Sequence, residues 1–201
     1  MSAILFKQPE AVFIHIPKTG GRTVRALWGG QLKATECKGV MPEEWKDIYS
    51  FAFVRHPQMR LISAYNMFSK GTKHLESGVV VSRRVPILED ISFEDFIHKM
   101  FNEDDRDQKG SVTLHTLPMT DPYNLIEHAD FIGKQEKFEH DMRMIALDTG
   151  VRLDSNFPRV NVSEKDKTSM EVWDDLPVNL KNKVLDYYEE DFTTFNYEER
   201  F

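Results

Sequence analysis

The segment His15–Thr23, HIPKTGGRT, has the residue types of a loop that binds a phosphate or sulfate group. It follows an apolar run, Ala11–Ile16, that has the pattern of a buried strand, and the sequence RTVRALW after it has the pattern of a helix. Glycines let the backbone approach a ligand closely, and the unpaired N–H groups at the start of a helix favour an anion. We therefore expect an anionic group to be bound by Lys18, Thr19, Gly20, Gly21, Arg22 and Thr23.

A second cationic segment, FVRHPQMRLISAY, follows another apolar run, Ile48–Val54. Arg55 should emerge at the carboxyl end of that strand, which is where open α/β sheets bind ligands. Arg60 and Ser63 are three residues apart on the following helix and should share a face, where a guanidinium and a hydroxyl could hold a second phosphate. Two anion-binding segments after two strands predict one ligand with two separated anionic groups.

Two strand-then-helix units favour an α/β protein, in which a central parallel sheet is flanked by helices and carries a P-loop-like phosphate-binding loop. A third strand is expected within Asp130–Glu136, followed by a helix that ends before Gly150. Ser92 has the pattern of a capping box that opens a helix, and Leu176–Phe192 is predicted to form one C-terminal helix. The length of 201 residues, with no repeat or linker, favours a single domain over residues 1–201.

The formal net charge of −7, from 26 basic and 33 acidic residues, disfavours nucleic acids and anionic membranes as partners. The charge is unevenly distributed, because Ala11–Thr35 and Ile48–Leu75 each carry four basic residues and no acidic ones. One cysteine, Cys37, excludes an intrachain disulfide, and no spacing of acids and histidines indicates a metal site. The N-terminal residues lack the pattern of a secretion signal and no run approaches the ~20 apolar residues of a membrane span, so we expect a cytoplasmic protein. The oligomeric state is not indicated.

The paired segments HIPKTGGRT and FAFVRHPQMRLISAY resemble the signature of sulfotransferases that use 3′-phosphoadenosine-5′-phosphosulfate (PAPS). The resemblance is to the carbohydrate branch that includes heparan sulfate 2-O-sulfotransferase, and NLIEHADFIGKQEKFEHDM and VNVSEKDK also resemble segments of that family. It implies transfer of a sulfuryl group from PAPS to a hydroxyl of a carbohydrate-like or small-molecule acceptor, without a metal. Lys18–Thr23 would bind the phosphosulfate, Arg55 and Ser63 the 3′-phosphate, and the loop with Ser163 would close over the nucleotide.

Lys18 is the expected catalytic cation, because its ammonium can follow the negative charge that develops on the bridging oxygen. The acceptor hydroxyl also needs a base. Related enzymes often have a histidine in the segment after the first helix, where this chain has Lys33. His115 and His56 are the other candidates, and an ordinary structural role is the competing interpretation of each. His15 is expected to fix the loop.

Two other functions stay open on the sequence. A non-catalytic module that binds nucleotides or sulfoglycans is compatible with Lys33 in place of the histidine. A P-loop-type kinase would need an acidic residue for Mg²⁺ after the second strand, and Arg55 stands there instead. The acceptor is expected to meet the segments Gly71–Asp90 and Asn102–Asp121, which carry Lys73, Arg83, Arg84, Arg106 and Lys109.

Overall fold

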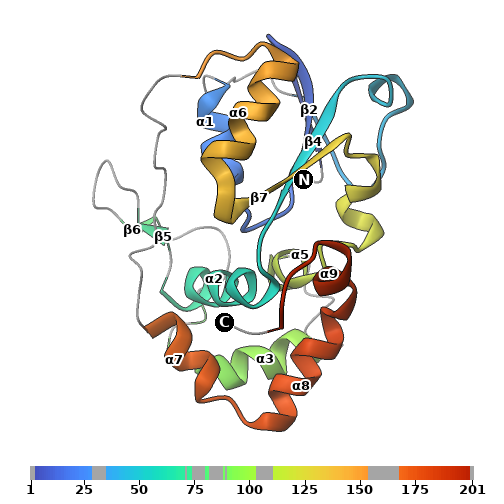
Figure 1. The fold of residues 1–201 in the computed structure, drawn as a ribbon. Coiled ribbons are helices and arrows are strands. Elements are labelled where there is room, and N and C mark those ends of the chain that lie inside the picture. Colours follow the sequence, from blue (N-terminus) through green and yellow to red (C-terminus); the bar gives the residue numbers. More distant parts are fainter. Residues whose placement is uncertain are drawn as a thin grey trace. The chain divides into compact units, whose positions relative to one another are not determined.

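A computed structural model describes residues 3–28, 35–70, 72–73, 80–81, 88, 90–102, 111–153 and 168–199. The chain divides into two compact units (Figure 1). Unit 1 comprises residues 1–55 and 119–159, and unit 2 comprises residues 56–118 and 160–201. The single domain over residues 1–201 stays a prediction.

Unit 1 contains a five-stranded sheet with the strand order β3-β1-β2-β4-β7. The three strands expected from the sequence are confirmed as β2 (Glu10–Ile14), β4 (Ser50–Val54) and β7 (Phe131–Lys134), and they are parallel. The sheet as a whole is mixed, which corrects the prediction of a parallel sheet. β1 (Ala3–Lys7) is antiparallel to both β2 and β3 (Thr35–Cys37). The α/β class with helices against the sheet is confirmed.

The central strands β1, β2 and β4 are buried on both faces of the sheet of unit 1. Phe13, Phe51 and Phe53 share one face and form a core with the helices α1 (Gly21–Leu27) and α6 (Phe138–Thr149). Figure 1 shows these two helices side by side. Ala52 and Val54, which alternate with the phenylalanines of β4, are buried on the other face. Burial on both faces explains why β4 is an unbroken apolar run in the sequence.

The carboxyl ends of the three parallel strands meet at one edge of the sheet. Ile14 is in register with Ala52, and Val54 is in register with Lys134. The segment that follows β2, Arg55 after β4, and the turn after β7 therefore begin beside one another. This edge positions the candidate site. The described part of unit 1 also contains the short 3₁₀ helices η1 (Glu43–Trp45), η2 (Pro122–Asn124), η3 (Ile126–His128) and η4 (Gln135–Lys137).

The described part of unit 2 is mainly helical. Its core joins Leu61 and Phe68 of the second helix to Phe96, Trp173 and Tyr188. The elements are α2 (Pro57–Lys70), α3 (Phe93–Phe101), α5 (Ser111–Thr116), α7 (Thr168–Asp174), α8 (Val178–Tyr187) and α9 (Glu189–Thr194), with the two-residue strands β5 (Thr72–Lys73) and β6 (Val80–Val81). None of the helices in the described ranges has the length and hydropathy of a membrane-crossing segment.

Two helix predictions in unit 2 have different outcomes. The helix start at Ser92 is confirmed with the N-cap bond of the box, because the Ser92 hydroxyl accepts a hydrogen bond from the Asp95 N–H at 3.0 Å; the Asp95 carboxylate in turn accepts from the Ser92 hydroxyl at 2.7 Å. The single helix over Leu176–Phe192 is wrong. The chain forms α8 and α9 instead and breaks at Tyr188, whose buried hydroxyl donates to the Thr116 carbonyl at 2.6 Å.

Candidate anion-binding site

The segment of residues 15–23, here called the anion loop, turns sharply between β2 and α1. Lys18 and Gly20 both adopt left-handed conformations, with φ values of 72° and 98°. The Gly20 carbonyl then accepts the N–H groups of Thr23 at 2.9 Å and Val24 at 3.3 Å, which starts the helix. Thr19 is fully buried and its hydroxyl donates to the Ile16 carbonyl at 2.8 Å. The Thr19 side chain therefore holds the loop, and only its backbone is suited to meet a ligand.

Both glycines of the anion loop are required by close packing. A Cβ on Gly21 would lie 2.2 Å from Nε2 of His15, so no larger residue fits without displacing the imidazole. A Cβ on Gly20 would lie 3.3 Å from the ring of Phe138 in α6, at a φ that already disfavours side chains. The His15 ring thus packs directly on the start of α1, and its role in fixing the loop through a hydrogen bond stays a prediction.

Two arginine side chains of unit 1 lie in or against the anion loop. Arg22, the second residue of α1, has a buried Nη1 atom with no hydrogen-bond partner among the residues that the structure describes. Arg55 reaches the loop from the end of β4, and its Nη1 donates to the Lys18 carbonyl at 3.4 Å. Buried guanidinium nitrogens are normally satisfied, so the unpaired Nη1 of Arg22 is suited to an anionic oxygen.

Arg60 does not belong to this site, which corrects the expectation that it clamps a phosphate beside Ser63. Its side chain is fully buried in unit 2, where Nη1 donates to the Leu117 carbonyl at 2.7 Å. Burial lowers the pKa of Arg60, while the nearby Tyr188 and Asp191 oppose the shift. Spacing along the helix relates Arg60 to Ser63, but it does not show which face is turned into the core.

Ser63 and His115 both belong to unit 2. Ser63 is half-buried on α2, and its joint clamp with Arg55 stays a prediction. His115 is half-buried on α5, with its ring edge-on to Phe68 at 5.5 Å between ring centroids. Its role as a base also stays a prediction.

His56 has the surroundings of a structural residue. It is 8% exposed, and its ring lies edge-on to those of Phe192 and Tyr197. Nε2 is hydrogen-bonded to the Glu198 carbonyl at 2.9 Å. These contacts tie the C-terminal residues to the start of α2 and support the ordinary structural interpretation of His56.

The third strand contributes a wall of the site that sequence reasoning missed. The N–H of Lys134, the last residue of β7, donates to the Asp141 carboxylate of α6 at 2.7 Å. This bond fixes the turn that leads to Phe138, against which Gly20 packs. Gly133 is equally constrained, because a Cβ there would lie 2.7 Å from the Phe53 ring. The sequence predicted both this strand and the helix after it, but nothing in FIGK indicated that their turn packs against Gly20.

The chain matches the profile of the sulfotransferase family over residues 2–198. It belongs to that family. Carbohydrate sulfotransferase 11 of Rattus norvegicus and that of Mus musculus are each 26% identical to it over 169 residues. The match covers 76% of this chain and 47% of each relative, so the chain spans about half the length of these curated relatives. No solved structure matches it significantly.

Several predicted residues of this sulfotransferase-family chain lie outside the described residues. They include the candidate base Lys33 and the nucleotide-loop residue Ser163. Most of the cationic residues expected to meet the acceptor lie outside as well, namely Arg83, Arg84, Arg106 and Lys109. Lys73 is placed by its backbone in β5.

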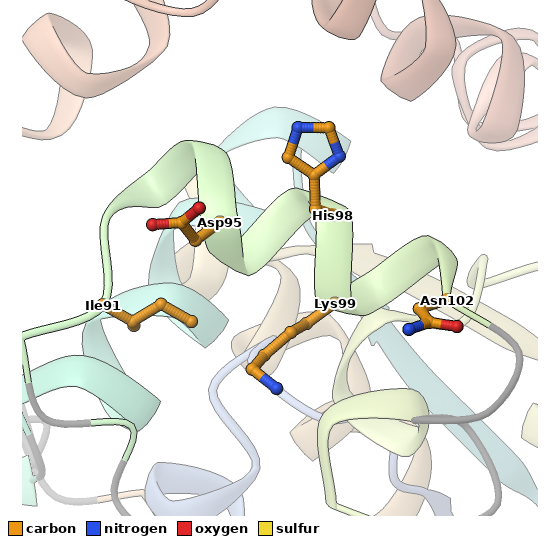
Figure 2. A pocket seen from close by; sticks show the side chains of 5 residues that line it. All are labelled: Ile91, Asp95, His98, Lys99 and Asn102. Atoms are coloured by element: carbon orange, nitrogen blue, oxygen red, sulfur yellow. The ribbon is translucent and has the colours of Figure 1, made fainter.

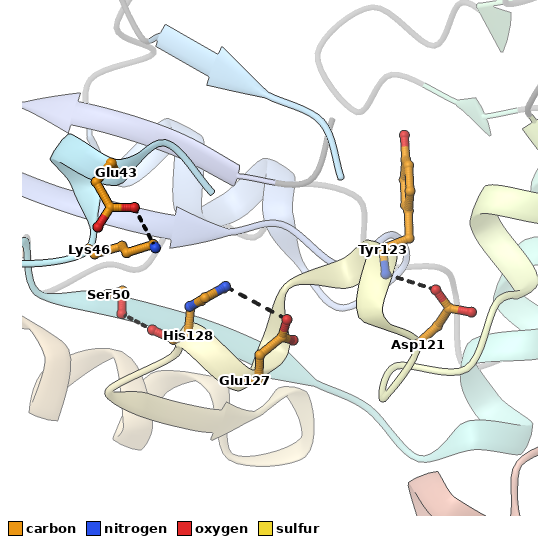
Figure 3. A network of polar contacts seen from close by, with 7 residues as sticks. All are labelled: Glu43, Lys46, Ser50, Asp121, Tyr123, Glu127 and His128. Atoms are coloured by element: carbon orange, nitrogen blue, oxygen red, sulfur yellow. Dashed lines mark hydrogen bonds and ion pairs between the residues drawn. The ribbon is translucent and has the colours of Figure 1, made fainter. Parts of the chain in front are cut away.

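A network of polar contacts supports the opposite end of β4 (Figure 3). The Ser50 hydroxyl donates to the His128 carbonyl, and the Ser50 N–H donates to the Asp130 carboxylate at 2.8 Å. The Asp121 carboxylate accepts the Tyr123 N–H at 2.9 Å and caps η2. Because Ser50 is the first residue of β4, its bonds to His128 and Asp130 hold the amino end of the strand in place and do not line the anion loop. The described residues contain no cluster of three acids, histidines or cysteines suited to a metal ion.

An open pocket lies on the exposed face of α3 in unit 2 (Figure 2). It is lined by Ile91, Asp95, His98, Lys99 and Asn102. Asp95 is engaged by the Ser92 cap, and His98 lies 3.9 Å from the Glu94 carboxylate. None of the residues predicted for the site lines this pocket.

Proposed function

We propose that the chain is a sulfotransferase domain that transfers a sulfuryl group from PAPS to a hydroxyl of a carbohydrate-like acceptor. Family membership and the printed names of the curated relatives support the reaction class. The observation that carries the proposal is the buried Nη1 of Arg22, which has no hydrogen-bond partner within the described ranges, beside the tight glycine turn. That combination offers an anionic oxygen a charged donor in a place from which water is largely excluded.

The 5′-phosphosulfate of the donor is assigned to the anion loop. Lys18, Arg22 and Thr23 supply side-chain donors, and Thr19, Gly20 and Gly21 supply backbone N–H groups. Arg55, Ser63 and Ser163 are assigned to the 3′-phosphate and its surroundings. The loop's closeness to the carboxyl edge of three parallel strands supports this assignment, because ligands of α/β sheets bind there.

The reaction moves one sulfuryl group between two oxygens. The bond from sulfur to the bridging phosphate oxygen breaks, a bond from sulfur to the acceptor oxygen forms, and the hydroxyl proton passes to a base. Adenosine 3′,5′-bisphosphate leaves with the electron pair of the broken bond. Lys18 would stabilise that leaving oxygen, while Lys33 or His115 would take the proton. A lysine can accept a proton near neutral pH only where cationic neighbours or burial lower its pKa.

Calorimetry with adenosine 3′,5′-bisphosphate tests the donor site. The bisphosphate should bind in the absence of Mg²⁺, and Arg55→Ala should weaken it. Arg25→Ala is the matched control, because Arg25 is a partly exposed arginine of α1 that pairs with Glu36 at 3.2 Å. Tight binding of Mg²⁺–ATP without any binding of the bisphosphate would refute the proposal and favour a kinase. Bisphosphate binding without sulfate transfer to any hydroxyl acceptor would favour a non-catalytic module.

A further inference from the structure

Lys18 occupies a backbone conformation that its own residue type resists. Its φ of 72° lies in the left-handed region, where a side chain crowds the following carbonyl. Such conformations persist only where the surroundings enforce them. The anion loop must therefore contain contacts that hold the Lys18 peptide.

Two side chains donate hydrogen bonds to backbone carbonyls of this strained turn. The Thr19 hydroxyl donates to the Ile16 carbonyl at 2.8 Å. The Arg55 guanidinium donates through Nη1 to the carbonyl of Lys18 itself, at 3.4 Å. Arg55 is well placed to do so, because it directly follows β4 and its N–H is held by the Met119 sulfur at 3.5 Å. The contact joins the two anion-binding segments of the sequence through one guanidinium.

We infer that Arg55 is a positioning residue for Lys18, in addition to its proposed contact with the 3′-phosphate; this inference rests on the proposed function. A guanidinium carries five N–H donors in a rigid fork, so one nitrogen can hold a carbonyl while others bind a phosphate. A 3′-phosphate bound by the fork would fix Nη1 against the Lys18 carbonyl. The 3′-phosphate of the nucleotide thereby helps to position Lys18, which acts at the 5′ end of the same nucleotide.

Amide hydrogen exchange on the ligand-free chain tests the contact without any catalysis. Arg55→Met keeps an unbranched apolar stem and removes every donor, so the amides of residues 18–21 should exchange about fivefold faster, the factor for one lost hydrogen bond of about 1 kcal/mol. The amides of β2 serve as the internal reference, because global destabilisation would accelerate both sets together. Ser63→Ala is the control, since Ser63 shares the proposed 3′-phosphate and the inference gives it no part in holding the Lys18 carbonyl. Unchanged exchange of residues 18–21 relative to β2 in Arg55→Met would overturn the inference.

Nucleotide affinities give a second, independent readout. If Arg55 met only the 3′-phosphate, Arg55→Met would weaken adenosine 3′,5′-bisphosphate and leave adenosine 5′-monophosphate unaffected. The inference predicts a loss of about fivefold for the monophosphate as well, with partial recovery in Arg55→Lys, whose ammonium keeps N–H donors but lacks the rigid fork. Ser63→Ala should weaken the bisphosphate alone. A wild-type chain that binds no bisphosphate would refute the proposed function, whereas the exchange result would still decide the Arg55–Lys18 contact.

Discussion

At the scale of single residues, the anion loop combines strain and close packing at the positions that the chemistry needs. Lys18 is a left-handed residue without being glycine, and Gly21 touches an imidazole. Strained residues of this kind persist only where surrounding contacts hold them, and they cluster at functional sites. The two positions make different predictions.

Lys18 separates function from stability. Lys18→Ala should lower sulfuryl transfer by about 10²–10³-fold, the usual effect of losing a donor that stabilises developing negative charge. Lys18→Gly should lose as much activity as Lys18→Ala. Its unfolding free energy should be about 1 kcal/mol larger than that of Lys18→Ala, because glycine accepts a φ of 72° without strain. Transfer assays and urea unfolding of both variants measure these effects. Equal stability of the two variants would argue against strain at this position.

Gly21 is predicted to be intolerant because of one neighbour. Gly21→Ala places a methyl group 2.2 Å from Nε2 of His15, and we expect a loss of about 1–3 kcal/mol in unfolding free energy. The double variant with His15→Ala should recover part of that loss, because the clashing ring is gone. Gly150→Ala is a useful control, since its Cβ would meet nothing within 4 Å and only its φ of 74° is unfavourable. No recovery in the double variant would contradict the packing explanation.

At the scale of elements, the sequence was informative where an apolar run was followed by a turn and a helical pattern, both for β4, which is fully buried, and for β7, which is partly exposed. β2, β4 and β7 stood out as apolar runs followed by turns. β1 was not predicted because its apolar run directly follows the N-terminus, where such a run is also compatible with a targeting segment. In the structure it forms a short hairpin with β2. The helix break at Tyr188 was missed because a tertiary contact, the bond from its hydroxyl to the Thr116 carbonyl, outweighs the local helical pattern.

The same scale explains the error at Arg60. Its type and spacing suited an anion clamp, yet the guanidinium is buried in the helical core beside Asp191. Residue type alone could not distinguish a cation that awaits a ligand from one that binds a carbonyl inside the protein. Arg22 and Arg55, by contrast, were assigned from a strand-to-turn position, and both lie in or against the anion loop.

Because Arg60 is buried, we expect its substitution to lower stability. If it held a phosphate, its substitution would instead lower the affinity for the bisphosphate. Arg60→Ala empties the space of a fully buried side chain and removes its hydrogen bond to the Leu117 carbonyl, and we expect a loss of about 2–5 kcal/mol in unfolding free energy. Ser63→Ala, three residues along α2, should cost much less. Chemical unfolding of the two variants provides the comparison. A stable Arg60→Ala chain that binds the bisphosphate more weakly would support the prediction that Arg60 holds a phosphate beside Ser63.

At the scale of the whole molecule, net charge and local charge point in opposite directions. The chain carries −7, yet its two acid-free blocks include the anion loop and Arg55. The overall charge therefore argues against nucleic acids as ligands but does not describe the site. Local cations draw an anionic ligand through interactions that salt screens.

This separation of charge predicts a specific salt dependence. Bisphosphate affinity should fall several-fold as ionic strength rises from 0.01 M to 1 M, since the Debye length shortens from about 30 Å to about 3 Å. The fall should be smaller in Arg55→Ala, which has one cation fewer. Calorimetric titrations at several salt concentrations measure both slopes. An affinity that rises with salt would show that repulsion from the acidic remainder of the chain dominates.

The central claim is tested most directly by sulfate transfer itself. The chain is incubated with PAPS labelled in its sulfuryl group and with a panel of carbohydrate hydroxyl acceptors, in the absence of Mg²⁺. We predict that label passes to at least one acceptor, that adenosine 3′,5′-bisphosphate is released in equal amount, and that Lys18→Ala reduces both. Absence of label on every acceptor, from a wild-type chain that is folded and binds the bisphosphate, would contradict the claim of catalysis.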